Sequence, residues 1–445
     1  RIVYFQLGNA EEIIGRGSWQ NGRSRMRIIA DFHIHSKYSR ATSKDMVIEG
    51  ISKWAKRKGI DIIGTGDFTH PLWLGQIKQE LSEDGSGFLT AKNPAPGAGS
   101  GPKFILTGEI SSIYTQGGKG RRVHTIIFVP DIATAQKIND KLTGIGNLYS
   151  DGRPILGLSA KDLAKVILDI NPNSLIIPAH AWTPWFSIFG SNSGFDSIEE
   201  CYGELANNIY SIETGLSSDP EMNWRLSALD KITLISNSDA HSPANLGREA
   251  NVFEIEPSKL TYQEIADIIK TKDNKRFLYT IEFFPEEGKY HFDGHRNCNI
   301  VVNPFEKKYP NNICPKCGRK LTIGVMNRVE QIADRPAGHS DEKFPGSKHL
   351  VPLQEIIAES LGVQKGSRKV DEEYLKLVNH FTCEFKILLD IPIEELSMIN
   401  PKVAQGIDQM RQSKGELEPG YDGVYGKVRV ISDENFQSSK QASLF

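Results

Sequence analysis

Apolar runs alternate with amphipathic segments between Met26 and Thr280. Runs such as RIIADFHIH and IDIIGTGDF have the short, β-branched character of buried strands. MVIEGISKWAKRKG instead repeats apolar residues at helical spacing and ends at Gly59, a residue typical of a helix C-terminus. This alternation predicts an α/β fold with a parallel sheet or barrel over residues 26–285. The interval 82–103 is rich in Gly, Pro and Ser, which predicts a loop.

The pattern changes after residue 285. Residues 286–335 hold few apolar side chains but carry His, Cys and Gly, which predicts a small module organised around metal. Helical spacing returns over residues 336–425, where we expect a helical C-terminal domain. The polar segment 426–445 is predicted to be a flexible tail. Residues 1–25 fit no element of the sheet and are interpreted as a leader or added segment, or as an extra strand.

Composition excludes some classes of protein and leaves others open. The chain of 445 residues carries 53 Lys and Arg against 55 Asp and Glu, so bulk charge gives no argument for nucleic acid, although a local basic face remains open. No apolar run approaches the roughly 18 residues of a membrane helix, and no secretory signal precedes the first strand. Three of the five cysteines cluster, which favours metal binding in a reducing, cytoplasmic compartment over a disulfide scaffold.

Metal-ligand residue types recur near the ends of the predicted strands. His33 and His35 follow the first apolar run, and residues i and i+2 of a strand share a face, so both imidazoles can bind one ion. The full set is His33, His35, Asp67, Glu109, His124, His180, Asp239 and His241. Any one of them alone could be a capping or packed residue. Because strand carboxyl ends surround one site in an α/β barrel, the repeated placement favours a metal centre. His124, which opens its run, has the weakest placement.

Histidine and carboxylate ligands together suit zinc, manganese or iron better than magnesium alone. Eight ligands exceed the needs of one ion, so we expect two or three ions with Glu109 as a bridge. Such clusters activate water and stabilise the attacking and leaving oxygens of a phosphoester. Asp239, Glu109 and His241 are the residues expected to act in catalysis.

A second metal site is predicted from two chelating pairs. His295 and Cys298 are separated by two residues, as are Cys314 and Cys317, and 15 residues lie between the pairs. Four such ligands predict a closed tetrahedral zinc site with a structural role. His291 is the competing fourth ligand.

The order of the first set of motifs resembles the PHP (polymerase and histidinol phosphatase) family. That resemblance implies a distorted (β/α)7 barrel with a trinuclear metal site. The chain departs from the family at TGDFTH and SKYSRATS, where Asp67 stands in place of a histidine and His70 is a substitute ligand or a substrate contact. The barrel followed by HRNC, CPKCG and GSKHLVPLQEIIAESLG resembles the endonuclease Q family in particular.

This second resemblance implies a metal-dependent DNA repair endonuclease. Members nick DNA 5′ to deaminated bases (uracil, hypoxanthine, xanthine) and abasic sites, using metal-activated water and base flipping. The expected cofactors are Zn2+ in the structural site and the cluster, with Mg2+ or Mn2+ for activity. The expected partner is lesion-bearing DNA, and the expected location is the nucleoid, not a membrane. One alternative is a PHP-type phosphoesterase of small phosphate monoesters, and another is a non-catalytic DNA-binding protein.

The segment AWTPWFSIFGSNSGFDSIEE after His180 is predicted to contact the substrate. Its aromatic residues could stack on bases, and backbone N–H groups of its small residues could donate to the carbonyl that deamination creates. The predicted contacts are Trp182, Trp185, Phe186, Gly190, Ser191 and Ser193, together with Asn237. The alternative is a core loop that closes the barrel. At the end of the chain, Gln441-x-x-Leu444 resembles the start of a sliding-clamp-binding peptide without its final aromatics.

Overall fold

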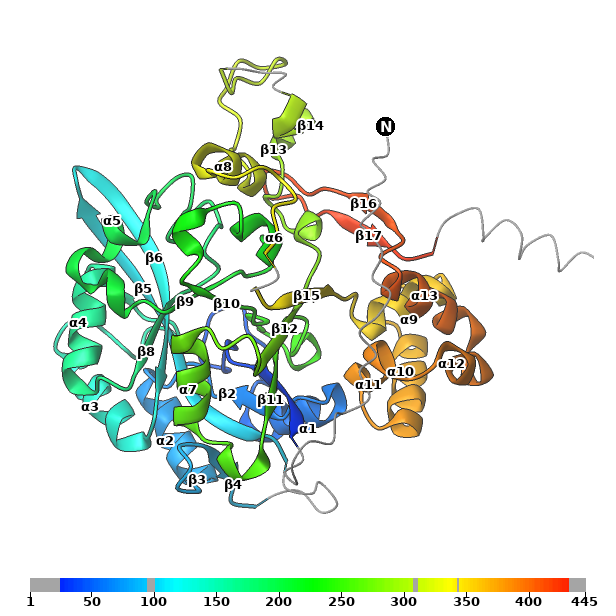
Figure 1. Ribbon diagram of the computed structural model, residues 1–445, viewed down its shortest axis with the longest axis horizontal. Helices are drawn as coiled ribbons and strands as arrows, with labels where there is room; N and C mark the ends of the chain where they lie inside the picture. Colours follow the sequence, from blue (N-terminus) through cyan, green and yellow to red (C-terminus); the bar gives the residue numbers. More distant parts are fainter. Residues whose placement is uncertain (1–24, 94–100, 307–310, 342–343, 432–445) are drawn as a thin grey trace, which may run out of the picture.

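The computed structural model describes residues 25–93, 101–306, 311–341 and 344–431. The predicted leader, apart from its last residue, and the predicted clamp-binding peptide lie outside these ranges. The described residues form a mixed α/β barrel, a small module above it and a helical region beside it (Figure 1).

Strands between residues 26 and 255 form the wall of the barrel. β1 pairs in parallel with β2, and β2 with β5, while β6 pairs antiparallel with both β5 and β8. β9 and β10 form a separate parallel pair, and β11 pairs antiparallel with β1. The strands are β1 (Met26–Asp31), β2 (Ile62–Gly64), β5 (Lys103–Gln116), β6 (Lys119–Val129), β7 (Ile155–Leu156), β8 (Leu175–Pro178), β9 (Ser211–Glu213), β10 (Thr233–Ile235) and β11 (Ala250–Ile255). The predicted α/β fold with a distorted PHP-type barrel is confirmed.

Strict strand–helix alternation fails at β5 and β6, which form a long hairpin. Their two-residue turn is Gly117–Gly118, with φ of 61° and 74°. Two consecutive positive φ angles match the twist of a tight hairpin, and glycine adopts them without strain. The expected loop at 82–103 was also wrong in part, because β3 (Leu81–Glu83) and β4 (Leu89–Ala91) form a short hairpin beside β5.

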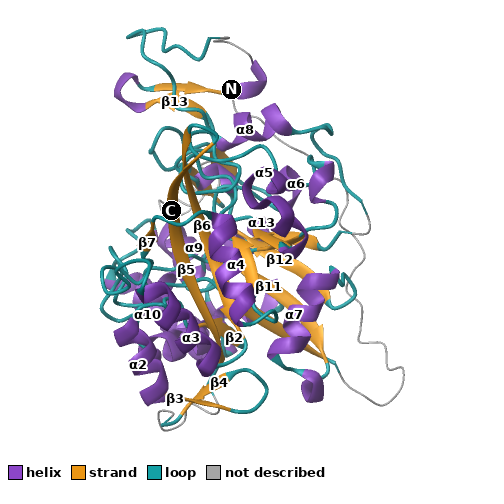
Figure 2. Cartoon of the chain, turned by 90° about the vertical axis from the view of Figure 1, so that its left-hand side faces the viewer, coloured by secondary structure: helices purple, strands orange, loops and turns teal. Residues whose placement is uncertain are grey.

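Amphipathic helices cover the outside of the barrel (Figure 2). They are α1 (Ile48–Lys58), α2 (Pro71–Glu80), α3 (Ile132–Thr143), α4 (Ala160–Ile170) and α7 (Tyr262–Thr271), with two short helices, α5 (Ile198–Tyr202) and α6 (Pro220–Asn223), in later loops. α1 ends at Gly59 in the left-handed conformation, as predicted. Among the described residues, every helix falls short of the length and apolar character that crossing a lipid bilayer would demand.

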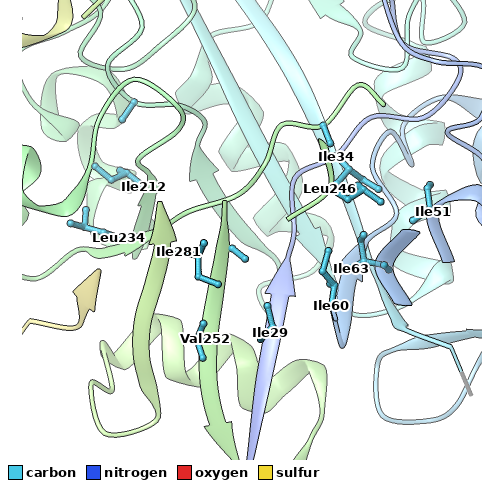
Figure 3. Close-up of a cluster of buried hydrophobic side chains, with 14 of the residues drawn as sticks. Ile29, Ile34, Ile51, Ile60, Ile63, Ile212, Leu234, Leu246, Val252 and Ile281 are labelled. Atoms are coloured by element: carbon cyan, nitrogen blue, oxygen red, sulfur yellow. The ribbon is translucent and has the colours of Figure 1, made fainter. Parts of the chain in front are cut away.

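Alternate residues of the strands enter two different cores. Ile28 and Ala30 of β1 pack with apolar residues of β2, β5, β6 and β8. Ile29 between them belongs to the second cluster, next to Val252 of β11, and Ile281 of β12 lies close by (Figure 3). This period of two is the expected pattern for a strand with both faces buried.

The small module is built on two short strands, β13 (Asp293–His295) and β14 (Ile300–Val302), and α8 (Val325–Ile332) follows it. β15 (Gly346–His349) then pairs in parallel with β12 (Phe277–Glu282) at the edge of the barrel sheet. The segment expected to begin the helical domain therefore extends the barrel sheet instead.

The helical region contains α9 (Leu353–Leu361), α10 (Arg368–Phe381), α11 (Glu384–Leu389), α12 (Ile393–Ile399) and α13 (Pro401–Arg411). The chain then forms the antiparallel pair β16 (Glu416–Glu418) and β17 (Lys427–Arg429). Between these strands, Tyr421 donates to Asn299 and Asp422 accepts from Thr322. The turn between β16 and β17 therefore packs against the small module, while the backbone of Val430 and Ile431 donates to Glu359 of α9.

A buried ion pair joins the barrel to the helical region. Lys58 Nζ of α1 lies 2.8 Å from Glu384 Oε2 of α11, and both side chains are at most 4% exposed. Tyr374 also donates to Glu384 Oε2, and the Leu353 backbone N–H donates to Oε1. The carboxylate of Glu384 is therefore fully satisfied only while both parts of the protein are docked.

We expect Lys58→Met to lower the free energy of unfolding by about 3–5 kcal/mol, because it leaves a buried carboxylate without its cation. Urea denaturation measures the change. Lys165→Met is the control, since its partner Asp169 and Lys165 itself are both more than 60% exposed, and such a pair contributes about 0.5 kcal/mol. Equal effects of the two variants would contradict the prediction.

Candidate metal centre

The candidate ligands lie on loops after the barrel strands and on the β5–β6 hairpin. His33 and His35 follow β1, His180 follows β8 and Asp239 follows β10. Glu109 and His124 lie within their strands, not at the ends as expected. Ser111 pairs with His124, and Glu109 is two residues from Ser111, so Glu109 and His124 share a face of the hairpin.

The first group of ligand atoms comes from His33, His35, Glu109 and Asp239, and all four atoms lie within 4.8 Å of one another. His35 Nε2 is 3.0 Å from Asp239 Oδ1 and 3.3 Å from Glu109 Oε2. His33 Nε2 is 3.4 Å from Glu109 Oε2 and, among the described residues, has no hydrogen-bond partner although it is buried. A buried nitrogen without a partner is costly, so this donor set fits a metal ion.

The second group contains Glu109, His124 and His180. Glu109 Oε1 lies 2.7 Å from His124 Nδ1 and 3.2 Å from His180 Nε2. Glu109 therefore presents one oxygen to each group, which is the geometry of a bridging carboxylate.

Carboxylates behind the first group orient its histidines. His33 Nδ1 lies 3.0 Å from Glu213 Oε1, and His35 Nδ1 lies 3.0 Å from Asp67 Oδ1. Such pairs fix the tautomer that leaves Nε2 free for a metal. Glu213 also accepts from the His180 backbone N–H at 2.8 Å. One carboxylate therefore positions residues of both groups.

Asp67 differs from its predicted role as a ligand. It lies outside both groups, and its second oxygen accepts from the Ser36 backbone and from two hydroxyls, those of Ser36 and Ser39. His241 also lies outside the groups, with Nδ1 2.9 Å from the Asp239 carbonyl oxygen. His70 stacks on Tyr38 at the start of α2, in neither group.

Burial and neighbouring charges shift the pKa values of the residues in this centre in opposite directions. Burial lowers the pKa of His124 to about 4, even though Glu109 lies beside it. Burial alone would raise the pKa of Glu109, but His124, Arg153 and His33 hold it well below its ordinary range. The bridge is therefore ionised.

Three of the predicted ligands adopt a backbone conformation that non-glycine residues rarely use. The φ angles are 48° for Asp67, 27° for His180 and 45° for Asp239. Such strain persists where surrounding structure fixes it, and it clusters at functional sites. Each of these residues lies in a loop that directly follows a barrel strand.

Burial and hydrogen bonding argue against a direct role for two predicted substrate contacts. Trp182 is fully buried, and its Nε1 donates to Asn223 Oδ1 at 2.7 Å. Asn237 is also fully buried, and its amide is hydrogen-bonded to the Phe32 backbone and to Glu213. Both residues hold the loops in place and present nothing to a ligand.

The other predicted contacts lie in the loop after His180. Phe186 packs 4.7 Å from the His124 ring, measured between ring centroids, and Trp185 is 37% exposed against Tyr290. Ser191 Oγ donates to the Ile323 carbonyl, and Ser193 Oγ to the Arg122 carbonyl.

A cavity of about 430 Å³ opens beside this loop. Its lining includes Gly190, Ser191, Arg121 and Arg328, but none of the candidate ligands. The small residues of the loop therefore face a recess that is distinct from the metal groups.

Two residues of the centre were not predicted. Glu213 ends β9, so the strand-end placement that identified the other ligands could have identified it. Arg153 comes from a loop without a recognisable motif, and its Nη1 lies 3.1 Å from Glu109 Oε2.

Glu213→Gln is expected to lower metal affinity by about 10–100-fold, because the neutral amide orients and polarises His33 less strongly. Titration of the metal-stripped protein with Mn2+ measures this. Glu204→Gln, at an acid whose side chain is 72% exposed, should leave the affinity unchanged. An unchanged affinity for Glu213→Gln would show that His33 needs no support.

The small module brings its four predicted ligands together. One ligand atom each from His295, Cys298, Cys314 and Cys317 lies within 4.8 Å of the other three, whereas His291 is buried outside this group. The apolar core around them consists of Cys314 with Val302 and Leu321. So small a core cannot stabilise a module of this size alone.

Comparison with known proteins gives the following similarities. Residues 352–414 match the family model described as the MJ0043 C-terminal domain. An uncharacterized protein, MJ0043 of Methanocaldococcus jannaschii, is 33% identical over 251 residues, and the match spans 56% of this chain but 31% of that protein. The crystal structure of the lesion-specific endonuclease PfuEndoQ from Pyrococcus furiosus has a TM-score of 0.79 and 32% identity, covering 93% of this chain and 99% of that one. An endonuclease Q complex with a 27-mer duplex substrate that has an abasic lesion at the active site has a TM-score of 0.80 and 33% identity, covering 92% and 98%.

Proposed function

This chain belongs to the endonuclease Q family, and we propose that it is a metal-dependent DNA repair endonuclease. It nicks the phosphodiester 5′ to deaminated bases (uracil, hypoxanthine, xanthine) and to abasic sites. The observation that carries this proposal is the pair of ligand groups joined by Glu109 at one end of the barrel. Similarity to a lesion-specific endonuclease and to a complex with an abasic duplex supports the substrate class.

The donor sets fit ions that accept both imidazole and carboxylate. His33, His35, Glu109 and Asp239 would hold one ion, and Glu109, His124 and His180 a second. Bound there, such ions supply Lewis-acid stabilisation of a phosphodiester and lower the pKa of water. We propose zinc for these groups, with Mn2+ or Mg2+ as activating alternatives, and zinc for the small module.

Arg153 adds a fixed positive charge beside this centre. Its guanidinium pairs with Glu109 and is about a quarter exposed, so its remaining N–H groups can reach a phosphate oxygen. His241 is also partly exposed and lies beside Asp239. We propose that His241 lies next to the leaving 3′-oxygen.

We expect Arg153→Met to lower kcat/KM for nicking by about 10²-fold, because one fixed donor to the developing charge is lost. Single-turnover nicking of an abasic duplex measures the effect. Arg40→Met, at an arginine whose side chain is 82% exposed, is the control. If Arg153→Met instead binds less metal and keeps its rate, the role of Arg153 is to support metal binding.

Damage recognition requires the lesion to leave the base stack. Trp185 and Phe186 are two aromatic residues placed for stacking, since Trp185 is exposed and Phe186 lies beside the second ligand group. Sliding-clamp binding through Gln441-x-x-Leu444 is a separate proposal, because this peptide lies outside the described residues. Surface plasmon resonance against a clamp, with and without the last six residues, tests it.

The proposed activity is tested with end-labelled duplexes that carry one hypoxanthine, one uracil or one abasic site. Nicking 5′ to the lesion with Mn2+ or Mg2+, abolished by EDTA and absent from undamaged DNA, is the expected result. Hydrolysis of a small phosphate monoester without nicking would favour the phosphoesterase alternative and overturn the proposal.

A further inference from the structure

We propose that Asp219, Glu221 and His349 form an additional site for a divalent transition-metal ion, separate from the two groups in the barrel and from the small module. Asp219 and Glu221 lie at the start of α6, after the loop that follows β9, and His349 ends β15. Figure 1 shows β15 beside β12 and below α6. The site would therefore join a barrel loop to the strand that leads into the helical region.

The three side chains already have the spacing of ligands. One ligand atom from each lies within 4.8 Å of the other two. His349 Nε2 is 3.3 Å from Asp219 Oδ2, while Asp219 Oδ1 accepts from the Met222 backbone N–H. The two oxygens of Asp219 thus have different roles, and Oδ2 is the one presented to the site.

Glu282 supplies independent support for an ion. It is fully buried, and its Oε1 has no hydrogen-bond partner among the described residues. Its other oxygen accepts from the hydroxyls of Thr214 and Ser236. Glu282 pairs with His349 in the register of β12 and β15, so the two side chains lie on the same face of the sheet. Its carboxylate also interacts electrostatically with both His349 and Asp219.

A buried carboxylate oxygen without a donor is unfavourable. Three acidic side chains (Asp219, Glu221 and Glu282) lie near one imidazole here. A divalent cation bound by Asp219, Glu221 and His349 would place positive charge near Glu282. One imidazole with several carboxylates suits manganese, zinc or iron. The side chains of His349 and Asp219 are 24% and 15% exposed, so an ion can reach the site.

Occupancy of this site would stabilise the docking of β15. Leu350–Pro352 are all that separates β15 from α9, the first helix of the C-terminal region. Glu221 also accepts from Ser347 Oγ of the same strand at 2.9 Å. Losing the ion should therefore increase amide exchange in β15 and in the start of α9.

Metal content tests the proposal directly. Metal-stripped protein is reconstituted with Mn2+, and bound metal is counted by mass spectrometry for the wild type, His349→Gln and Glu221→Gln. Each variant is expected to bind one equivalent fewer than the wild type. Lys348→Gln is the matched control, since Lys348 lies on the same strand over the Tyr279 ring, and it should lose none. If the variants bind as many equivalents as the wild type, the three residues form only an ion pair and no metal site.

Anomalous diffraction from wild-type crystals grown in Mn2+ gives a second test that no folding defect can affect. A peak among Asp219 Oδ2, Glu221 and His349 Nε2 is expected. If no peak appears there while peaks are present in the barrel groups, the additional metal site is disproved. The proposed nuclease function is not affected by that result.

Discussion

Glu109→Gln is expected to lower nicking by about three orders of magnitude or more, the largest effect of any single substitution in the centre. Glu109 presents one oxygen to His33 and His35 and the other to His124 and His180. An amide has one oxygen and one NH2 group, so it cannot act as a bridging anion. Several kcal/mol of metal-derived stabilisation of the transition state would be lost, at one decade of rate per 1.36 kcal/mol. Single-turnover nicking of an abasic duplex measures the rate.

Metal counting on the same variant separates the cause from a folding defect. Both ligand groups include Glu109, so the variant should bind fewer ions at equal Mn2+ concentration, while its far-UV spectrum stays that of the wild type. Glu200→Gln, at an exposed acid of α5, is the control. Nicking within tenfold of the wild type would mean that the two groups do not form one catalytic centre.

The barrel and most of the residues that gather in the two candidate ligand groups were predictable, because both depend on local patterns. A β-branched run followed by His, Asp or Glu identifies a strand and the residue at its carboxyl end together. The same sequence signal cannot distinguish a metal ligand from a residue that hydrogen-bonds to that ligand. Asp67 follows β2 and Glu213 ends β9, yet both are hydrogen-bonded to Nδ1 of a histidine, the nitrogen that faces away from the ligand group. Only the positions of neighbouring loops decide which carboxylate faces the ion.

The β5–β6 hairpin could have been predicted from the sequence, whereas the position of β15 could not. The Gly117–Gly118 pair is a hairpin signal, and it could have predicted the antiparallel β6. The four residues of β15, GSKH, carry no hydrophobic period, so its pairing with β12 depends on tertiary contacts. Trp182 was predicted to contact the substrate because an aromatic residue beside a ligand can stack or pack. Its hydrogen bond to Asn223, 41 residues away in the sequence, indicates that Trp182 packs inside the protein.

Cys314→Ser is expected to remove one zinc and to unfold the β13–β14 module while the barrel stays folded. Among the described residues, the buried apolar core of this module is Cys314, Val302 and Leu321, with Cys298 and Ile300 partly buried against it. We therefore expect metal binding to supply most of its stability. Structural zinc contributes about 10–16 kcal/mol in isolated zinc-finger peptides, far more than such a core. Zinc content and amide exchange in β13 and β14 measure the two effects.

Cys383→Ser is the matched control for Cys314→Ser. Cys383 is the N-cap residue of α11, outside the four-ligand group, and serine is favoured at a helix N-cap. This variant should keep its full zinc content and its unfolding midpoint. Because Tyr421 and Asp422 pack on the module through Asn299 and Thr322, exchange should also rise between β16 and β17 in Cys314→Ser alone. A Cys314→Ser protein with full zinc content and a protected β13–β14 pair would show that the module is held by packing and not by metal.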